Sequence, residues 1–537
     1  MAATVAVADD QQSFAALDRY IEQARQDWQI PGAAIGVIRN GEVIYVKGFG
    51  EREAGKAARV DEHSLFQIGS LTKAFTAAAV GLLVDEGKLA WDDPVVKHLP
   101  TFMVADPWLT RNITVRDLIA HRTGLEGGTH VMKPGDPARR MKEVSTMTSN
   151  IPFRSSVLYS NSMYDVAGQV IAAVSGMSWD DFIAQRLLAP LQLRESSPDV
   201  VAARIWDSKY LAPSMYGQAP AIRASIDNAP QANVTMPHWL TKDGNKPLPW
   251  QILLPGGGGA SGSMVSNLHD LLTWTRFNMG DGRTANGTPL LREQTLRELH
   301  TAQIFVDRPS SASSEITWRT VRQAVPGNDA VSYRPAYALG WFVNTYRGYR
   351  YINHGGALLG AMSTIAFLPE RQLAVVVLTN SYGTGGRGLF NPAVTLRVVD
   401  EFLGVEPRNW SADLRRTFDA YDPMAKQDRE RQLQSARPKK QPPSLPLASY
   451  GGEYESEAFG KVEVVRSGDR LALRLPGVFE WPLEHWHRDT FRMHVTSGGV
   501  ELMDFLATFQ VDPLGRITSF DPGWVLFGGA MKPVKKN

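Results

Sequence analysis

A serine and a lysine stand three residues apart, at Ser70 and Lys73, where an apolar, alanine-rich run begins. The run ends near Gly87 and has helical length and composition, so both side chains are expected on one helix face. A serine hydroxyl is a weak nucleophile, and an amine with a lowered pKa can take its proton or hold a base in place. By itself, the spacing is more typical of a helix cap followed by a solvated lysine, so a catalytic interpretation needs partners elsewhere.

A phenol and an amide, Tyr159 and Asn161, come directly before a second helical pattern. We expect the phenol, if it lies beside Lys73, to ionise and act as a base, because a nearby ammonium lowers its pKa. The Asn161 amide could hydrogen-bond both the lysine and a substrate carbonyl. The alternative is a turn that carries a packed tyrosine.

A third polar stretch contains His354 followed by Gly355, Gly356 and Ala357. Two glycines at the edge of a strand let a substrate backbone approach closely. We expect the N–H of Ala357 to form an oxyanion hole with the N–H of Ser70. Taken alone, His354 is more typical of a capped turn.

Composition excludes several classes of function. The chain has 537 residues, a formal net charge of +2 and no cysteine. This charge gives no electrostatic case for nucleic acid, and the lack of cysteine rules out disulfides, thiolate nucleophiles and cysteine-ligated metals. No run of about 18 apolar residues predicts a membrane span. His485 and His487 share a strand face without an evident third ligand, so we expect no metal and no cofactor.

The length predicts two or three domains. A first domain at 13–408 is expected to start with an amphipathic helix and a hairpin turning at Asn40 and Gly41. A helical block at 64–290 is then inserted before late strands and a helix near 390–404. Within it, residues 205–250 are rich in aromatic residues and are interpreted as a lid or pocket wall, or as a peripheral insertion packed on itself. The late strands are predicted at 337–344, 349–353, 362–368 and 373–378.

The two ends of the chain differ in character from this domain. Residues 1–12 have small residues in an arrangement typical of the end of a secretory signal, and we expect a residual, disordered tail there. Residues 409–445 predict a charged helix and a proline-rich linker. From 446 to 537, short strands recur about every ten residues, which predicts a small antiparallel β-barrel.

The three polar stretches occur in an order and at separations that resemble the motifs of penicillin-recognising serine hydrolases. The resemblance covers about residues 13–405, and the similar group is the class C β-lactamase-like peptidases and esterases, which include DD-carboxypeptidases and D-aminopeptidases. Residues 446–537 resemble the lipocalin-like barrel appended to some of these peptidases. Side motifs agree with this resemblance at residues 114–125, 258–264 and 337–341.

The resemblance implies an α/β plus all-α serine β-lactamase-like (DD-peptidase) fold with an antiparallel sheet. It also implies acyl transfer through Ser70, with Lys73 and Tyr159 activating the nucleophile and Tyr159 protonating the leaving group. His354 stands where true β-lactamases carry lysine, which weakens the expectation of penicillin hydrolysis.

The substrate expected from the resemblance is a small peptide that contains D-residues or is a linearised cyclic peptide, such as linear microcystin. A carboxylesterase is the first alternative, and a non-catalytic penicillin-binding-like sensor is the second. The expected location is periplasmic or secreted, with a cytoplasmic location as the alternative, and the sequence leaves the oligomeric state open.

Overall fold

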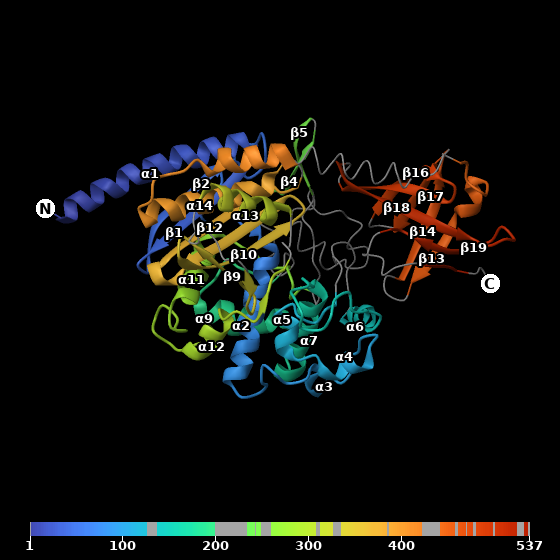
Figure 1. The fold of residues 1–537 in the computed structure, drawn as a ribbon, viewed down its shortest axis with the longest axis horizontal. Helices are drawn as coiled ribbons and strands as arrows, with labels where there is room; N and C mark the ends of the chain where they lie inside the picture. The colour runs from blue at the N-terminus through green and yellow to red at the C-terminus, as the bar shows by residue number, and fades with distance from the viewer. Residues whose placement is uncertain are drawn as a thin grey trace.

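Two sheets of eight strands each organise the molecule (Figure 1). The first, with helices on both faces, forms what we call the sheet domain, and the second forms a small barrel beside it. Among the described residues, no helix combines the length and the apolar character needed to cross a bilayer. The computed structural model describes residues 2–125, 137–198, 233–241, 243–248, 259–307, 312–325, 335–383, 386–421, 441–456, 460–468, 470–475, 479–497, 500–523 and 531–534.

The sheet of the first domain is antiparallel and has the order β2-β1-β12-β11-β10-β9-β8-β7. Strand β1 pairs with β12 from Ala33 opposite Thr379 to Arg39 opposite Leu373, so the two ends of the domain meet in its centre. Asn40 and Gly41 have φ of 53° and 79°, as a tight two-residue hairpin turn requires, and the predicted hairpin is confirmed. The strands are β1 (Gly32–Arg39), β2 (Glu42–Gly50), β7 (Ile304–Phe305), β8 (Ala336–Tyr337), β9 (Phe342–Tyr346), β10 (Tyr349–Leu358), β11 (Ala361–Leu368) and β12 (Leu373–Thr379).

Three helices, α1 (Ala2–Asp27), α13 (Ala312–Ala324) and α14 (Phe390–Leu403), lie over one face of this sheet (Figure 1). A disordered tail was expected at residues 1–12, but helix α1 begins at Ala2. Four of its first seven residues are alanine, the strongest helix former, which accounts for a helix there. A further helical segment, 410–421, packs in the same layer.

The predicted domain boundary at residue 408 is too early. Trp410 is fully buried in the core of this face, and its Nε1 donates to Asp400 Oδ2 at 2.8 Å. Residues 410–421 therefore complete the sheet domain instead of starting the linker. The predicted proline-rich linker lies mostly at 422–440, outside the described residues.

The inserted helical block covers the opposite face of the sheet (Figure 1). Some of its helices begin at capping side chains: before α5, Thr114 forms a capping box with Asp117, and before α11, the Asn267 side chain accepts from the N–H of Asp270. The helices are α2 (Thr72–Asp85), α3 (Val95–His98), α4 (Pro107–Asn112), α5 (Val115–Ile119), α6 (Pro137–Ser145), α7 (Asn161–Ser175), α8 (Trp179–Ile183), a π-helical turn (Ala184–Leu188), α9 (Ala189–Leu191), α11 (Leu268–Met279) and α12 (Glu293–Leu299).

Two late strands differ from their predicted bounds. The strand expected at 337–344 is split into β8 and β9 by a turn at Gly340, which has φ +84° and lies against the backbone of α2 beside Lys73. Strand β10 does not end at residue 353 but continues to Leu358, because the backbone of its two glycines keeps pairing with β11. The extension carries the third polar stretch along the sheet instead of in a turn.

The C-terminal sheet follows chain order from β13 to β19 and forms a nearly closed antiparallel barrel, as predicted. A pair between Phe520 and Met531 brings β19 next to β20, which itself pairs with β13. The strands are β13 (Gly452–Ser456), β14 (Gly460–Ser467), β15 (Arg470–Leu475), β16 (Phe479–His487), β17 (Thr490–Ser497), β18 (Val500–Val511), β19 (Ile517–Asp521) and β20 (Lys532–Pro533).

A small hairpin, β4 (His238–Thr241) and β5 (Gly244–Pro247), stands between the two sheets. Trp239 and Leu248 pack there against Val500 and Leu502 of the barrel. The N–H of His238 donates to the carbonyl of Gly360 at the β10–β11 turn. Most of the predicted lid, including the stretches 205–232 and 249–250, lies outside the described residues.

Candidate active site

Ser70 lies on a tight turn, Gly69–Leu71, that leads directly into α2. Gly69 has φ +53°, and a side chain on it would come within 2.8 Å of the backbone N of Ala357. Only glycine therefore lets this turn press against β10. The turn that carries Ser70 thus packs directly against the backbone of Ala357, and the oxyanion hole expected from their two N–H groups stays a prediction.

Lys73 is completely buried one helical turn after Ser70. Its Nζ donates to Ser70 Oγ at 3.0 Å, to Asn161 Oδ1 at 2.7 Å and to the Ser261 carbonyl at 2.6 Å. All three acceptors are neutral. Burial lowers the pKa of Lys73 to about 7, although the charge of Asp165 acts in the opposite direction. An amine with this pKa is neutral often enough near pH 7 to accept the Ser70 proton.

Tyr159 lies with its ring 4.8 Å from Lys73 Nζ, and its phenol hydrogen-bonds Ser70. Burial raises the pKa of this phenol well above its ordinary value, and the hydrogen bond to Ser70 offsets only part of the rise. The expectation that a neighbouring ammonium would ionise Tyr159 is therefore wrong. Lys73 is itself easily deprotonated, so the phenol keeps its proton and is suited to donate it.

His354 is buried on β10, and its ring centroid is 6.4 Å from that of Tyr159. Nδ1 is 2.7 Å from the Gly355 carbonyl and Nε2 is 3.1 Å from the Tyr337 hydroxyl. A carbonyl can only accept, so Nδ1 carries the proton and Nε2 accepts from Tyr337. Burial and the charge of Lys73 lower the pKa of His354 to about 3, so it is a neutral group on a strand and not a turn cap.

The two glycines after His354 have different neighbours. A Cβ on Gly356 would lie 1.8 Å from the Ile68 carbonyl, which also accepts from the Ser363 hydroxyl at 2.7 Å. Gly356 thus fixes the distance between β10 and the Ser70 turn. Strand β9 stops pairing at Phe342 opposite Asn353, and among the described residues no strand occupies that edge of 354–358.

Comparison with known proteins agrees with this geometry. The beta-lactamase family model matches residues 17–399. The chain belongs to the beta-lactamase family. A second model, for a domain of unknown function, DUF3471, matches residues 436–523 of this beta-lactamase family member and so covers most of its barrel.

Relatives of this family member include hydrolases and penicillin-binding proteins. An unguisins hydrolase of Aspergillus campestris is 28% identical over 470 residues, which cover 84% of this chain and 78% of the relative. Penicillin-binding protein 4 of Amycolatopsis lactamdurans is 26% identical over 361 residues, 66% of this chain and 82% of that protein. These relatives and the family support a serine hydrolase.

Solved structures show the same fold. An octameric penicillin-binding protein homologue from Pyrococcus abyssi superposes with a TM-score of 0.57 at 21% identity, over 97% of this chain and 100% of that one. A class C beta-lactamase mutant superposes with a TM-score of 0.53 at 19% identity, over 73% and 98% of the two chains. The predicted fold class is confirmed.

His121 was not among the predicted site residues, yet its ring packs at a tilt against two tyrosines, with centroids 4.1 Å from Tyr159 and 4.7 Å from Tyr337. Its Nδ1 accepts from the N–H of Ser160 at 3.1 Å, and its φ of 55° is unusual for a residue other than glycine. Burial lowers its pKa well below the ordinary range, so the ring is neutral. In the sequence, His121 stands within the side motif at residues 114–125, but that motif by itself did not indicate a role for the histidine.

A cavity of about 460 Å³ opens at Ser70 and is lined there by Tyr159, His354 and the backbone of Gly355 to Ala357. This volume lies within the usual range for small-molecule sites. Lys73 and Asn161 lie behind Ser70, and Asn161 contacts the lysine as predicted. The structure thus brings all eight predicted site residues into one cluster.

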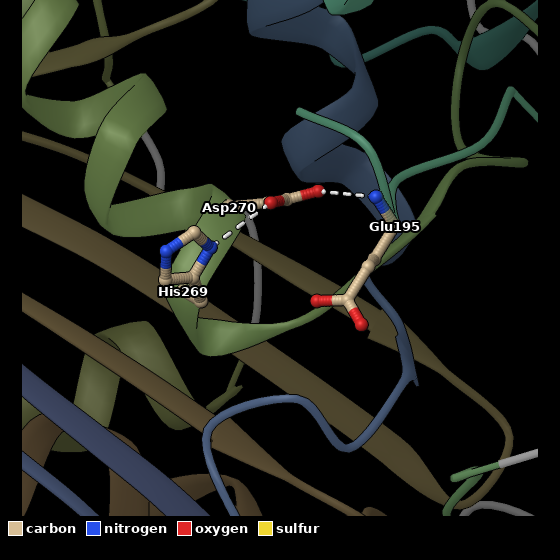
Figure 2. Close-up of side chains that lie close together, drawn as sticks. All are labelled: Glu195, His269 and Asp270. Atoms are coloured by element: carbon tan, nitrogen blue, oxygen red, sulfur yellow. Dashed lines mark hydrogen bonds and ion pairs between the residues drawn. The ribbon is translucent and has the colours of Figure 1, made fainter. Parts of the chain in front are cut away.

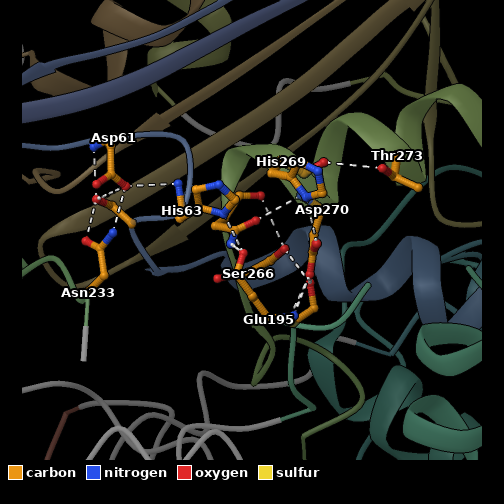
Figure 3. A network of polar contacts seen from close by, with 11 residues as sticks. Asp61, His63, Glu195, Asn233, Ser266, His269, Asp270 and Thr273 are labelled. Carbon is orange, nitrogen blue, oxygen red and sulfur yellow. Dashed lines mark hydrogen bonds and ion pairs between the residues drawn. The ribbon is translucent and has the colours of Figure 1, made fainter. Parts of the chain in front are cut away.

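A separate group of side chains, Glu195, His269 and Asp270, has possible metal-ligand atoms within 4.8 Å of one another (Figure 2). Asp270 Oδ2 already accepts from the backbone N–H groups of Glu195 and Ser196, at 3.0 Å and 2.8 Å. His63 Nδ1 lies 2.7 Å from Glu195 Oε2, and this hydrogen bond raises the pKa of His63. The network around the start of α11 joins four chain segments, those of Asp61, Glu195, Asn233 and Asp270 (Figure 3), so we assign it a structural role.

Proposed function

We propose that this protein is a serine peptidase that forms a covalent acyl-enzyme on Ser70 and cleaves small peptides, either D-residue-containing or linearised cyclic ones. The observation that carries the proposal is the hydrogen bond of 3.0 Å from Lys73, whose pKa is about 7, to the Ser70 hydroxyl. Ser70 is also exposed to the cavity, where a substrate carbonyl can reach it.

In the acylation step, neutral Lys73 takes the Ser70 proton while Oγ forms a bond to the substrate carbonyl carbon. The N–H groups of Ser70 and Ala357 hold the negative charge that develops on the carbonyl oxygen. Tyr159 donates its proton to the leaving nitrogen as the C–N bond breaks, and Lys73 returns a proton to Tyr159. The amine departs neutral, and the acyl group stays on Ser70.

In the deacylation step, a water molecule attacks the Ser70 ester. The same two side chains act in reverse: Tyr159 and Lys73 accept the water proton and return one to Ser70 Oγ as the ester bond breaks. The carboxylic acid product leaves, and both groups regain their starting protonation states. No other reactant is needed.

The free edge of β10 favours a peptide over an ester. Residues 354–358 pair with β11 on one side only, so their other edge offers backbone N–H and C=O groups to an extended chain. An added substrate strand would gain main-chain hydrogen bonds there, which a simple ester cannot make. The neutral His354 offers less to a penicillin carboxylate than a fixed ammonium would.

The nucleophile is tested by labelling with a fluorophosphonate and measuring the intact mass, with Ser70→Ala as the control. We expect one adduct, located on Ser70 by peptide mapping and absent from the variant. An unmodified mass would contradict the acyl-enzyme, and an adduct without any turnover would indicate a penicillin-binding-like sensor.

The substrate class is tested by comparing p-nitrophenyl acetate with short peptides that carry a D-residue or an L-residue at the scissile bond. We expect amide cleavage within the peptide panel. Fast ester turnover with negligible amide cleavage would make the protein a carboxylesterase instead.

A further inference from the structure

The cavity at Ser70 continues past the catalytic side chains onto the other face of the sheet. It runs over β9 and β10 and beneath α13, where Trp318 lines it, and reaches Leu396 of α14. Figure 1 shows α13 lying over this part of the sheet. We call the part lined by Asn344, Tyr351 and Trp318 the rear pocket.

Gly355 forms the passage between Ser70 and the rear pocket. Side chains alternate along a strand, so Tyr351, Asn353 and position 355 face the α13 side of β10. A Cβ on Gly355 would meet only the Ser363 carbonyl at 3.5 Å, an ordinary contact. Unlike Gly356, this glycine leaves space instead of avoiding a clash.

The rear pocket has two aromatic walls, Trp318 and Tyr351, and a buried amide, Asn344, while Glu315 and Arg322 line the same cavity on α13. Trp318 and Tyr351 meet edge to face, with ring centroids 5.8 Å apart. Asn344 pairs directly across from Tyr351 in the β9–β10 ladder and is 4% exposed. Its Nδ2 donates to Asn353 Oδ1 at 3.0 Å, whereas its Oδ1 has no hydrogen-bond partner among the described residues.

A buried acceptor without a partner is costly, and a ligand donor would satisfy it. Aromatic walls favour a flat ring, which can pack edge to face on them. We propose that the rear pocket selects a substrate side chain next to the scissile bond that is aromatic and ends in a hydrogen-bond donor, as in tyrosine or tryptophan. This inference rests on the proposed function and names its substrate class.

The experiment compares two series of substrates in the full chain. One series carries alanine, phenylalanine or tyrosine on the acyl side of a p-nitrophenyl ester, and the other carries them on the amine side of an amide, each in both enantiomers. In at least one series we expect kcat/KM for tyrosine to exceed that for alanine by about tenfold or more. Equal rates across both series would overturn the inference.

Variants locate the preference in the rear pocket. Trp318→Ala is expected to reduce the tyrosine-to-alanine ratio about tenfold, and Trp318→Phe to restore part of it. Asn344→Leu removes the amide acceptor, so the ratio of kcat/KM for tyrosine to that for phenylalanine is expected to come close to 1. Arg319→Ala, on an exposed position of the same helix, is the matched control and should change neither ratio. Unchanged ratios in folded Trp318 and Asn344 variants would overturn the inference.

A binding measurement separates this inference from the proposed function. Ser70→Ala, which cannot form the acyl-enzyme, is expected to bind N-acetyltyrosinamide more tightly than N-acetylalaninamide in calorimetry, and Trp318→Ala in that background to lose the difference. Equal binding of the two amides would contradict the rear pocket even where fluorophosphonate labels Ser70. Absence of label on Ser70 with selective binding intact would contradict only the hydrolase.

Discussion

The two eight-stranded sheets of this molecule differ in how the chain builds them. In the barrel, strands β13 to β19 lie beside their neighbours in sequence, so its pairings are local. In the sheet domain, residues 33–39 pair with 373–379, and a long helical block is inserted between them. Ser70 and Tyr159 come from that block and meet His354 on the sheet. Long-range pairing therefore builds the reactive cluster.

The two regions also meet through a small interface. The β4–β5 hairpin contributes Trp239 and Leu248, the barrel contributes Val500 and Leu502, and Leu359 beside the β10 turn packs against them. The barrel has a separate hydrophobic core of its own. We therefore expect changes at Ser70 and changes in the barrel to have different effects on activity and on stability.

The largest expected effect is loss of the nucleophile. Ser70→Ala should reduce kcat/KM on any substrate by at least about 10³-fold, because the covalent step is removed. Thermal unfolding should change little, since Ser70 lies at the cavity wall. Both are measured on one purified sample by steady-state kinetics and calorimetry. Turnover that survives would contradict the role given to Ser70.

The next effect is the dependence of activity on pH. The Lys73 pKa of about 7 lies below the ordinary value of 10.5, so Lys73 is increasingly protonated and unable to act as base below pH 7. We expect kcat/KM on a small ester to fall about tenfold per pH unit below 7 and to level off above it. His354, with a pKa of about 3, does not titrate in this range. A flat profile from pH 5 to 9 would contradict Lys73 as the base.

A smaller effect is expected when the hydrogen bond that holds His354 is removed. Tyr337→Phe leaves the buried Nε2 of His354 without its donor, which should cost about 1–3 kcal/mol of stability and about tenfold in kcat/KM. Tyr346→Phe is the matched control, because its buried hydroxyl donates to Asp400 Oδ1 at 2.7 Å in the other hydrophobic layer. The control should lose stability but not activity. Equal loss of activity in both variants would indicate a general folding defect.

The smallest effect is expected at the interface with the barrel. Leu502→Asp places a charge against Trp239 and should weaken the contact by about 1–3 kcal/mol, seen as a lower first transition in calorimetry. We expect kcat/KM on p-nitrophenyl acetate to change less than about threefold, and the ranking of peptide substrates to change more. Loss of ester turnover equal to that caused by Ser70→Ala would show that the barrel supports the fold of the site itself.

The sequence by itself determined the local features of this protein. The spacing of Ser70 and Lys73 fixed their common helix face, Asn40 and Gly41 specified a tight hairpin, and regular strand spacing predicted the barrel. These features depend on residues close together in the chain, so periodicity and turn chemistry contain them. The predicted bounds of one strand and of the first domain were wrong where contacts between distant residues set them, at Gly340 and at Trp410.

Only the tertiary structure decided the electrostatics of the site. Desolvation, not spacing, lowers the pKa of Lys73 and raises that of Tyr159, so the amine and not the phenol is the group that readily loses its proton. The Tyr337 hydroxyl fixes the tautomer of His354, and the His121 ring packs against Tyr159; each of these contacts joins two different elements of the chain. Desolvation and these contacts depend on which surfaces meet when the helical block folds onto the sheet, and no local pattern encodes that meeting.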